Sequence, residues 1–292
     1  MEKGRLFQWH PACSFGFLLS AIAVTMLVTH PMIVGISLMG GLAVTARQQG
    51  WRSALRALIG SAAVSLLLTL LNLFFNRNGQ TPLFTVGNRI VTWEAAVYGA
   101  VIGMAFAAAV LWWSCLSRVM TSDRLQALFG KRFPSLCLLV SMVLGFLPRY
   151  GRRIREIVRV QRVLSGDSAT RHDRWRRSAD ALACATSWAA EGALVTADSM
   201  TARGYGSGKP SRYRLFAWDR RSVTAAGVGT LLLAAVIAGL AGGSCPTVFY
   251  PTLALTGSGD GWIGGAWVAF CLLPILDEGR EVLTWRILSL KT

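Results

Sequence analysis

The apolar residues of this chain are grouped in blocks, and most of the blocks are long enough to cross a lipid bilayer as a helix. A helix needs about 20 apolar residues to cross the roughly 30 Å of hydrocarbon. Six blocks are found, of which the first, second and last are short: 12–29, 31–46, 54–75, 95–116, 222–242 and 262–277. We therefore predict an all-α, polytopic membrane protein with about six transmembrane helices.

The overall composition agrees with this prediction. Of the 292 residues, 53% are hydrophobic and only 15% are charged, whereas a soluble domain carries roughly 25% charged residues. A net charge of +16 could indicate a nucleic-acid partner. However, the basic residues lie between the apolar blocks, and no zinc-binding spacing or RNA-binding aromatic signature accompanies them. We therefore predict no nucleic-acid partner and interpret the charge as a signal of membrane topology.

The positions of the basic residues predict the orientation in the membrane. Lysine and arginine accumulate in the cytoplasmic loops of membrane proteins. The loop after the second block contains Arg47, Arg52 and Arg56, whereas residues 243–261 contain no basic residue. Six spans with both termini in the cytoplasm satisfy this asymmetry.

The segment 117–221 is the largest predicted cytoplasmic part, because it holds 20 of the 30 basic residues and 8 acidic ones. It separates a membrane domain at 1–116, with four spans, from a second membrane domain at 222–292, with two. Within it, 133–148 is apolar enough to be considered as a seventh span. Positive charge flanks this stretch on both sides, which favours a helix packed at the membrane surface.

Residues 151–164 predict an amphipathic helix with one basic face. Arginines recur at three- and four-residue spacing: Arg152, Arg155, Arg159 and Arg162. Apolar residues occupy the opposite side: Ile154, Ile157, Val158 and Leu164. Such a helix suits an interface held by anionic lipid and equally suits docking of another protein.

Residues 175–203 predict a second helix, which is rich in alanine. Its small side chains lie nearly all round it: Ala179, Ala181, Ala183, Ala185, Ala189, Ala190, Ala193 and Ala197. Small residues permit close approach between helices, although alanine also favours helix formation without any further role. Ala189 and Ala193 lie one turn apart, so we expect both to be in close contact with the first helix or with a partner.

The alanine-rich helix has a distinct C-terminal end, Ala202-Arg203-Gly204-Tyr205-Gly206. An arginine near the last turn interacts favourably with the helix dipole, and a glycine just beyond adopts the left-handed conformation that ends a helix. The arginine also presents a planar, permanently charged donor to the carboxylate or helix end of a partner.

This end carries a resemblance to a known family. The run Met200 to Gly206, followed by Gly208-Lys209 and Tyr213, resembles the second Ala-Arg-Gly signature of the transmembrane (T) components of energy-coupling factor ABC importers, the EcfT/CbiQ family. Weaker matches extend along the chain: Pro31, Thr121-Ser122, Pro148, Pro274, Glu281 and Trp285. The first signature of the family is altered here to Gln161 to Asp167, where Arg162 and Gly166 stand in for its arginine and glycine.

The resemblance implies a division of labour among several proteins. Two cytoplasmic ATPases, identical or different, hydrolyse ATP, and a substrate-binding membrane protein, the S component, captures a vitamin or a transition-metal ion. The T component joins them in the cell membrane of a prokaryote through two long cytoplasmic coupling helices, and it performs no catalysis and needs no cofactor. The implied ATPase-docking residues are Ala202, Arg203, Gly204, Arg162 and Gly166. The implied helix-packing and S-component platform consists of Ala189, Ala193, Ile154, Ile157 and Val158.

Other chemistry is poorly supported by the sequence. His10, His30 and His172 are dispersed, and the six cysteines include no CxxC pair, so we predict neither a metal site nor disulfides. The glycines around Gly206 do not form a phosphate-binding loop, because Lys209 is followed by proline rather than by serine or threonine.

Two functions of other classes were weighed against the transporter. A membrane-embedded enzyme would need acidic residues or histidines clustered at membrane depth, and the apolar blocks contain no such cluster. A non-catalytic scaffold that binds membrane lipid through the basic segment fits the composition. It leaves the Ala-Arg-Gly ending unexplained, and it is the alternative interpretation.

Overall fold

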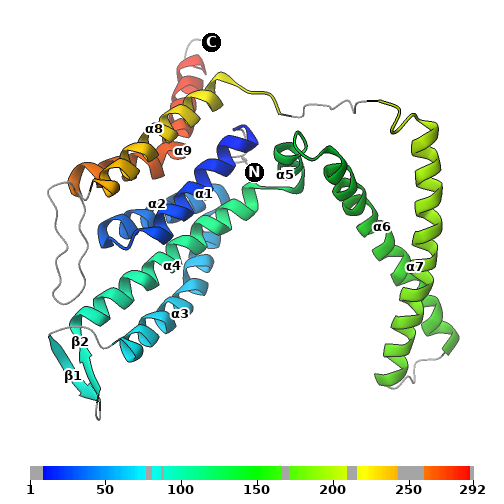
Figure 1. The fold of residues 1–292 in the computed structure, drawn as a ribbon, viewed down its shortest axis with the longest axis horizontal. Helices are drawn as coiled ribbons and strands as arrows, with labels where there is room; N and C mark the ends of the chain where they lie inside the picture. The colour runs from blue at the N-terminus through cyan, green and yellow to red at the C-terminus, as the bar shows by residue number, and fades with distance from the viewer. Residues whose placement is uncertain are drawn as a thin grey trace. The chain divides into compact units, whose positions relative to one another are not determined.

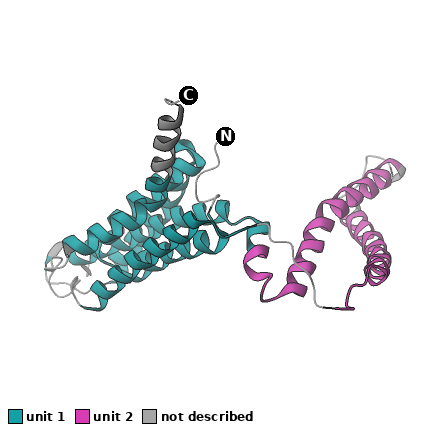
Figure 2. Cartoon of the chain, turned by 90° about the horizontal axis from the view of Figure 1, so that it is seen from above, with its two compact units in different colours: residues 1–125, 216–292 teal, residues 126–215 magenta. Residues whose placement is uncertain are grey.

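The computed structural model describes residues 9–76, 81–86, 89–165, 171–208, 216–242 and 260–289. The chain divides into two compact units (Figure 2). Unit 1 combines residues 1–125 with 216–292, and unit 2 consists of residues 126–215. The two stretches predicted as separate membrane domains, 1–116 and 222–292, thus belong to one compact unit.

The chain is mainly helical, as predicted (Figure 1). Unit 1 contains α1 (Pro11–Leu27), α2 (Pro31–Gln49), α3 (Trp51–Phe75), β1 (Pro82–Val86), β2 (Arg89–Thr92), α4 (Trp93–Val119), α8 (Arg220–Ala241) and α9 (Asp260–Ser289). Unit 2 contains α6 (Pro134–Ser165) and α7 (Arg171–Ala202). A short helix, α5 (Ser122–Phe129), spans the boundary between the units.

Within the described residues, four helices are long and apolar enough to cross a membrane: Trp51–Phe75, Trp93–Val119, Pro134–Val163 and Arg220–Ala241. Pro11–Leu27 and Gly261–Asp277 are apolar but shorter. A membrane protein is therefore supported. Three of the six predicted spans are among these long helices, and the remaining helix, Pro134–Val163, contains residues 134–148 of the stretch considered as a seventh span.

The structure joins two stretches that the sequence predicts separately. Residues 134–148 continue directly into the basic helix predicted at 151–164 and form α6 with it. The position of this stretch at the membrane surface stays a prediction. Pro148 lies inside α6. Proline has no backbone N–H and usually bends or breaks a helix interior, but here the helix runs on for 32 residues in all.

A β-hairpin before α4 was not predicted. β1 and β2 pair antiparallel, and an irregularity interrupts the register between Pro82 and Phe84. The hairpin is tied to α4 by Glu94, whose Oε1 accepts hydrogen bonds from the Thr81 backbone N–H at 3.3 Å and from the Thr81 hydroxyl at 2.7 Å. This contact also buries the Glu94 carboxylate at the N-terminal end of α4.

Helix α4 is central to unit 1, because it packs against α1, α2 and α3. Helix α9 packs against α2 and α8, and α1 also contacts α8. The core between these helices is rich in large side chains: Phe17, Leu18, Ile33, Trp112, Trp267 and Phe270. The Phe17 and Phe270 rings stack with centroids 4.7 Å apart, which joins α1 to α9.

Buried polar side chains in this core form a hydrogen-bonded series. The Trp112 indole N–H donates to the Ser37 hydroxyl oxygen at 3.0 Å. Ser37 in turn pairs with the Thr25 hydroxyl, and Thr25 donates to the Ala21 carbonyl at 2.7 Å. Because the single hydroxyl hydrogen of Thr25 is donated to Ala21, the Ser37 hydroxyl is the donor to Thr25, so the donors run from α4 through α2 to α1.

Small residues allow the helices to approach closely. A Cβ atom on Gly40 would lie 2.7 Å from the Cβ of Cys271, so α2 and α9 could not pack as they do with a larger residue there. A Cβ atom on Gly103 would lie 2.8 Å from the Thr69 hydroxyl and 2.9 Å from the Ser65 carbonyl. The contact between α3 and α4 therefore depends on Gly103.

The outer side of α3 is apolar and exposed, as expected of a helix that faces lipid. Only Ala54 and Ser61 are buried on this helix. Its large exposed side chains are Trp51, Ile59, Val64, Leu66, Leu67, Leu70, Leu71, Phe74 and Phe75. Such an extended apolar surface is rare on soluble monomers, which supports a lipid environment for unit 1.

The series of buried hydrogen bonds predicts the effect of Ser37→Ala. Without the hydroxyl, the Trp112 indole N–H loses its acceptor, which costs about 1–3 kcal/mol for a buried donor. The thermal unfolding midpoint of the detergent-solubilised protein should therefore fall. Ser117→Ala is the control, because Ser117 is exposed and bonds only within its own helix. Adding Trp112→Phe to Ser37→Ala should cost less than the two single changes together. Equal midpoints for Ser37→Ala and Ser117→Ala would contradict the role of the series.

Candidate functional site

Helix α6 consists of two halves with different chemistry. The first half, Pro134 to Pro148, contains no charged residue. Its large side chains are exposed on several sides: Leu136, Leu138, Leu139, Val140, Val143, Leu144 and Leu147. The second half carries exposed arginines: Arg149, Arg152, Arg153, Arg155, Arg159 and Arg162. One continuous helix thus joins an apolar surface to a basic one.

Helix α7 packs against α6 through small residues. Ala181 and Ala185 are buried, and Ala189, Gly192 and Thr196 are half-buried. A Cβ atom on Gly192 would lie 3.6 Å from the Tyr150 hydroxyl oxygen, so the end of this α6 side chain reaches the α7 backbone at Gly192. This seam of small residues, Ala181 to Thr196, is the main contact of α7 within unit 2.

The predicted apolar face of the basic helix lies on the α7 side. Ile154, Ile157 and Val158 are half-buried, and they share one helical face with Tyr150. The predicted basic residues Arg152, Arg155, Arg159 and Arg162 are exposed. The amphipathic pattern therefore serves the pairing of α6 with α7 and leaves the arginines accessible.

Arg153 lies outside the predicted basic stripe and links the two helices. Its guanidinium carbon lies 4.2 Å from the centroid of the Trp188 ring of α7. Its Nη1 also lies 3.2 Å from Glu156 Oε2, one turn further along α6. Exposed cation–π contacts contribute about 0.5–1 kcal/mol. The spacing of Arg153 and Glu156 was visible in the sequence, but the contact with Trp188 was not.

The two alanines predicted to pack closely have different positions. Ala189 is half-buried in the seam, whereas Ala193 is exposed and Gly192 takes the place beside α6. A helix has 3.6 residues per turn, so a contact face cannot continue in steps of four without an occasional step of three. Ala193 thus lies away from α6, and its contact with a partner stays a prediction.

The C-terminal end of α7 is built by a glycine cap. Gly204 has a φ of +82°, in the left-handed region. Its N–H donates to the Thr201 carbonyl at 2.9 Å, and the Tyr205 N–H donates to the Met200 carbonyl at 3.0 Å. These two bonds form a Schellman motif, with Ala202 as the last helical residue and Arg203 as the C-cap. The predicted glycine stop is therefore present.

Arg203 is presented at the tip of α7. The side chains of Ala202 and Arg203 are exposed, as is Gly204. Among the residues that the structure describes, none forms an ion pair with Arg203. The cap fixes the backbone beneath the arginine while the guanidinium stays accessible. A small, capped helix tip with one cation suits insertion into the groove of a partner that supplies a carboxylate.

The other predicted docking end is only partly described. Arg162 is exposed in the last turn of α6, and Gly166 lies outside the described residues. The contacts of Tyr150 with Gly192 and of Arg153 with Trp188 show that the helices run antiparallel. Each helix has 32 residues, which corresponds to about 48 Å at a rise of about 1.5 Å per residue. Arg162 and Arg203 therefore lie toward opposite ends of the pair (Figure 1).

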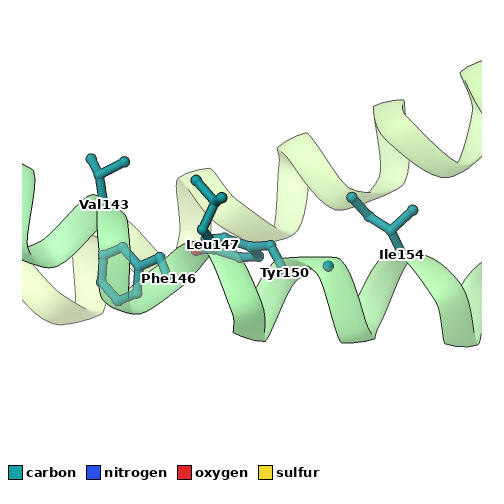
Figure 3. A pocket seen from close by; sticks show the side chains of 6 residues that line it. Val143, Phe146, Leu147, Tyr150 and Ile154 are labelled. Atoms are coloured by element: carbon teal, nitrogen blue, oxygen red, sulfur yellow. The ribbon is translucent and has the colours of Figure 1, made fainter. Parts of the chain in front are cut away.

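A shallow apolar hollow lies on α6 where its two halves meet (Figure 3). It is lined by Val143, Phe146, Leu147, Tyr150, Gly151 and Ile154. The rings of Phe146 and Tyr150 lie with centroids 5.8 Å apart, and the Arg149 guanidinium carbon lies 5.9 Å from the Phe146 ring centroid. Such a hollow can accept an apolar side chain of a partner, and no set of acid, base and nucleophile surrounds it.

In the described part of the chain, no three His, Cys, Asp or Glu side chains come together as metal ligands. His10 and His30 belong to unit 1, and His172 lies at the start of α7. The candidate site is thus a surface of unit 2: the tip of α7, the exposed arginines of α6 and the apolar hollow.

The seam of small residues predicts unequal effects of leucine at two alanines. Ala185→Leu should force α6 and α7 apart, because overpacking a close contact costs about 1–3 kcal/mol. Ala193→Leu is the matched control, since its side chain is exposed. Hydrogen exchange of the α6 amides in the purified chain should accelerate in the first variant only. Acceleration in both variants, or in neither, would show that the seam is placed wrongly.

The comparisons with known proteins assign no family to this chain. No family model matches it, and no curated protein matches it. What unit 2 does must therefore be inferred from the exposed Arg203 tip, the basic face and the apolar half of α6. A function for this chain has to account for an apolar, membrane-like unit joined to a basic helical unit.

Proposed function

We propose that this chain is the T component of an energy-coupling factor ABC importer. The observation that carries the proposal is the tip of α7, where a Schellman motif presents Arg203 between Ala202 and Gly204. This arrangement gives a structural reason for the Ala-Arg-Gly signature that the sequence resembles. The glycine ends the helix, the alanine keeps the tip narrow, and the arginine provides the charge.

In this proposal, the two ends of the α6–α7 pair each dock one cytoplasmic ATPase. The antiparallel arrangement supports it, because Arg162 and Arg203 lie toward opposite ends and could reach two different subunits. ATP-driven closure of the ATPases would then change the position of the pair, provided that the docked ends contact the two ATPase states differently. The chain itself performs no bond chemistry, and ATP hydrolysis takes place in the partners.

The S component is the proposed partner of the apolar half of α6. This half is exposed all round in the isolated chain and ends in the hollow around Phe146 and Tyr150. An exposed apolar surface of this kind is usually covered by a partner or by lipid. Positive charge at both ends of the stretch favours its retention on the cytoplasmic side. The S component would bring the transported vitamin or transition-metal ion.

Unit 1 holds the six proposed membrane spans: α1, α2, α3, α4, α8 and α9. The apolar parts of α1, α2 and α9 are short, and the packing of these helices against α4 and α8 shields them from lipid along part of their length. With both termini and residues 117–221 in the cytoplasm, the protein would be a multi-pass subunit of a prokaryotic cell membrane.

The lipid-binding scaffold remains the second candidate because of one observation. The exposed arginines of α6 directly follow its apolar half along the helix. An apolar surface next to a basic one also suits a helix that lies at the interface of a membrane with anionic lipid. The two candidates differ in the partner that binds Arg203. A scaffold would need no ATPase.

The docking role predicts that Arg203→Glu releases the ATPases. Breaking a desolvated pair between arginine and carboxylate costs about 2–5 kcal/mol, and the reversed charge adds repulsion. The measurement is the amount of ATPase bound per chain after purification, together with substrate uptake. Arg162→Glu is the matched variant at the altered first signature, and we expect it to leave a partly assembled and partly active complex.

The outcomes separate three possibilities. Equal loss from the two variants would contradict unequal docking, and full retention by Arg203→Glu would contradict the docking role of this residue. If the wild-type chain binds no ATPase but binds anionic vesicles, the scaffold is the better assignment. Arg155→Glu, in the middle of the basic face, should weaken vesicle binding without affecting ATPase binding.

The proposed topology predicts opposite labelling of two introduced cysteines. In a variant that lacks the native cysteines, Ser258→Cys should react with an impermeant thiol reagent added outside intact cells. Ser168→Cys should react only after the cells are opened, because residues 117–221 are assigned to the cytoplasm. Labelling of Ser168→Cys in intact cells would show that the orientation is wrong.

A further inference from the structure

The chain passes twice between the two units, after Leu125 and before Phe216. These two points lie next to each other on unit 1, although they are far apart in the sequence. The guanidinium carbon of Arg124 lies 5.6 Å from the centroid of the Phe216 ring. A cation–π contact thus connects Arg124, near the end of the first part of unit 1, to Phe216, the first residue of its second part.

Arg124 is held deeply in unit 1. It is only 4% exposed, and its Nη2 donates a hydrogen bond to the Trp9 carbonyl at 3.3 Å. Burial lowers the pKa of Arg124 from its ordinary value. A buried charge is costly unless it is paired or hydrogen-bonded. A leucine could fill such a position without that cost, so the arginine points to a role in holding specific neighbours.

A second contact fixes the returning chain. The ring of Trp218 stacks on the ring of His10, with centroids 4.1 Å apart and planes at 16°. The His10 backbone N–H donates to the Ser222 hydroxyl in the first turn of α8 at 3.2 Å. The His10 Nδ1 accepts the Ala12 N–H at 3.3 Å and caps α1. His10 therefore joins the returning segment to α1 and α8.

Trp9 extends the same cluster to the last helix. Its indole N–H donates to Asp277 Oδ2 of α9 at 2.9 Å, and its ring meets the Phe17 ring edge-on at 6.0 Å between centroids.

Burial lowers the pKa of His10, and the positive charge of Arg124 lowers it further. Both effects favour the neutral ring, whose Nδ1 can accept the Ala12 N–H.

We propose that Trp9, His10, Arg124, Phe216 and Trp218 form a clamp within unit 1, which holds the two points where the chain leaves and re-enters this unit against α1, α8 and α9. Its purpose rests on the proposed function: the clamp passes movement of unit 2 to the membrane helices. If the chain were free to move at these two points of unit 1, movement of unit 2 would change only the conformation of the connecting segments. With the clamp closed, the two crossing points cannot move independently of each other or of the core around Phe17.

Trp218 offers a way to test the clamp without disturbing the core, because 59% of its surface is exposed even in the stacked position. The test compares hydrogen exchange in the purified full-length chain for Trp218→Ala, Arg124→Leu and His10→Asn. Asparagine can still cap α1 but has no ring to stack. Arg118→Leu is the matched control, because Arg118 is an exposed arginine in the last turn of α4.

The clamp predicts that the three variants accelerate exchange several-fold in both 9–14 and 216–224, while Arg118→Leu changes neither segment. Arg124→Lys should give an intermediate result, because it keeps the charge but not the planar group. Exchange that stays unchanged in all three variants, or that changes only next to each substitution, would overturn the clamp.

The role in transmission needs a second measurement in the complex with ATPases and an S component. The clamp variants should keep the ATPases bound and keep hydrolysing ATP while moving several-fold less substrate per ATP. Arg203→Glu should instead lose the ATPases. Accelerated exchange with an unchanged ratio of transport to hydrolysis would overturn the transmission role. Failure of the wild-type chain to bind ATPases would overturn the proposed function, and the exchange comparison would still decide whether the clamp exists.

Discussion

The series of hydrogen bonds from Trp112 through Ser37 to Thr25 is the constraint on which the membrane unit depends. Lipid offers no partners for polar groups, so a polar group at membrane depth must be satisfied inside the protein. This series satisfies three buried side chains and connects α4, α2 and α1 in one place. The aromatic core around Phe17 then builds outward to α9. The clamp begins at the same helix, because His10 caps α1.

Features of the fold with a long, regular signal could be predicted from the sequence. The apolar block at 95–116 corresponds to α4, Trp93–Val119, because an uninterrupted apolar run of this length has few alternatives to a helix. The hairpin β1–β2 was missed, since its two short strands occupy one loop and carry no long alternating pattern. The continuity of α6 was missed as well. The apolar stretch up to 148 and the basic stretch from 151 have different patterns and suggest two elements, but the helix continues through Pro148 between them. The count of six spans and their orientation remain predictions.

In the candidate site too, features set by adjacent residues could be predicted, whereas contacts between residues far apart in the sequence could not. The glycine cap at Gly204 follows from a few adjacent residues, and the structure contains it. Which of Gly192 and Ala193 lies beside α6 depends on the phase of the helix over several turns; the structure places Gly192 there, and contact of Ala193 with a partner stays a prediction. The contact of Arg124 with Phe216 could not have been predicted, because no local pattern connects residues that are separated by the whole of unit 2.

The seam between α6 and α7 has a mechanical consequence. Ala181, Ala185 and Gly192 offer no large side chains to interlock, so the surface of α7 is nearly smooth along this line. Packed helices move past each other by small sliding displacements when few side chains must change rotamer. Tyr150 is the large side chain that meets the seam at Gly192. Few side chains would therefore have to change rotamer if the two helices slid along each other, apart from Tyr150 and the contact of Arg153 with Trp188.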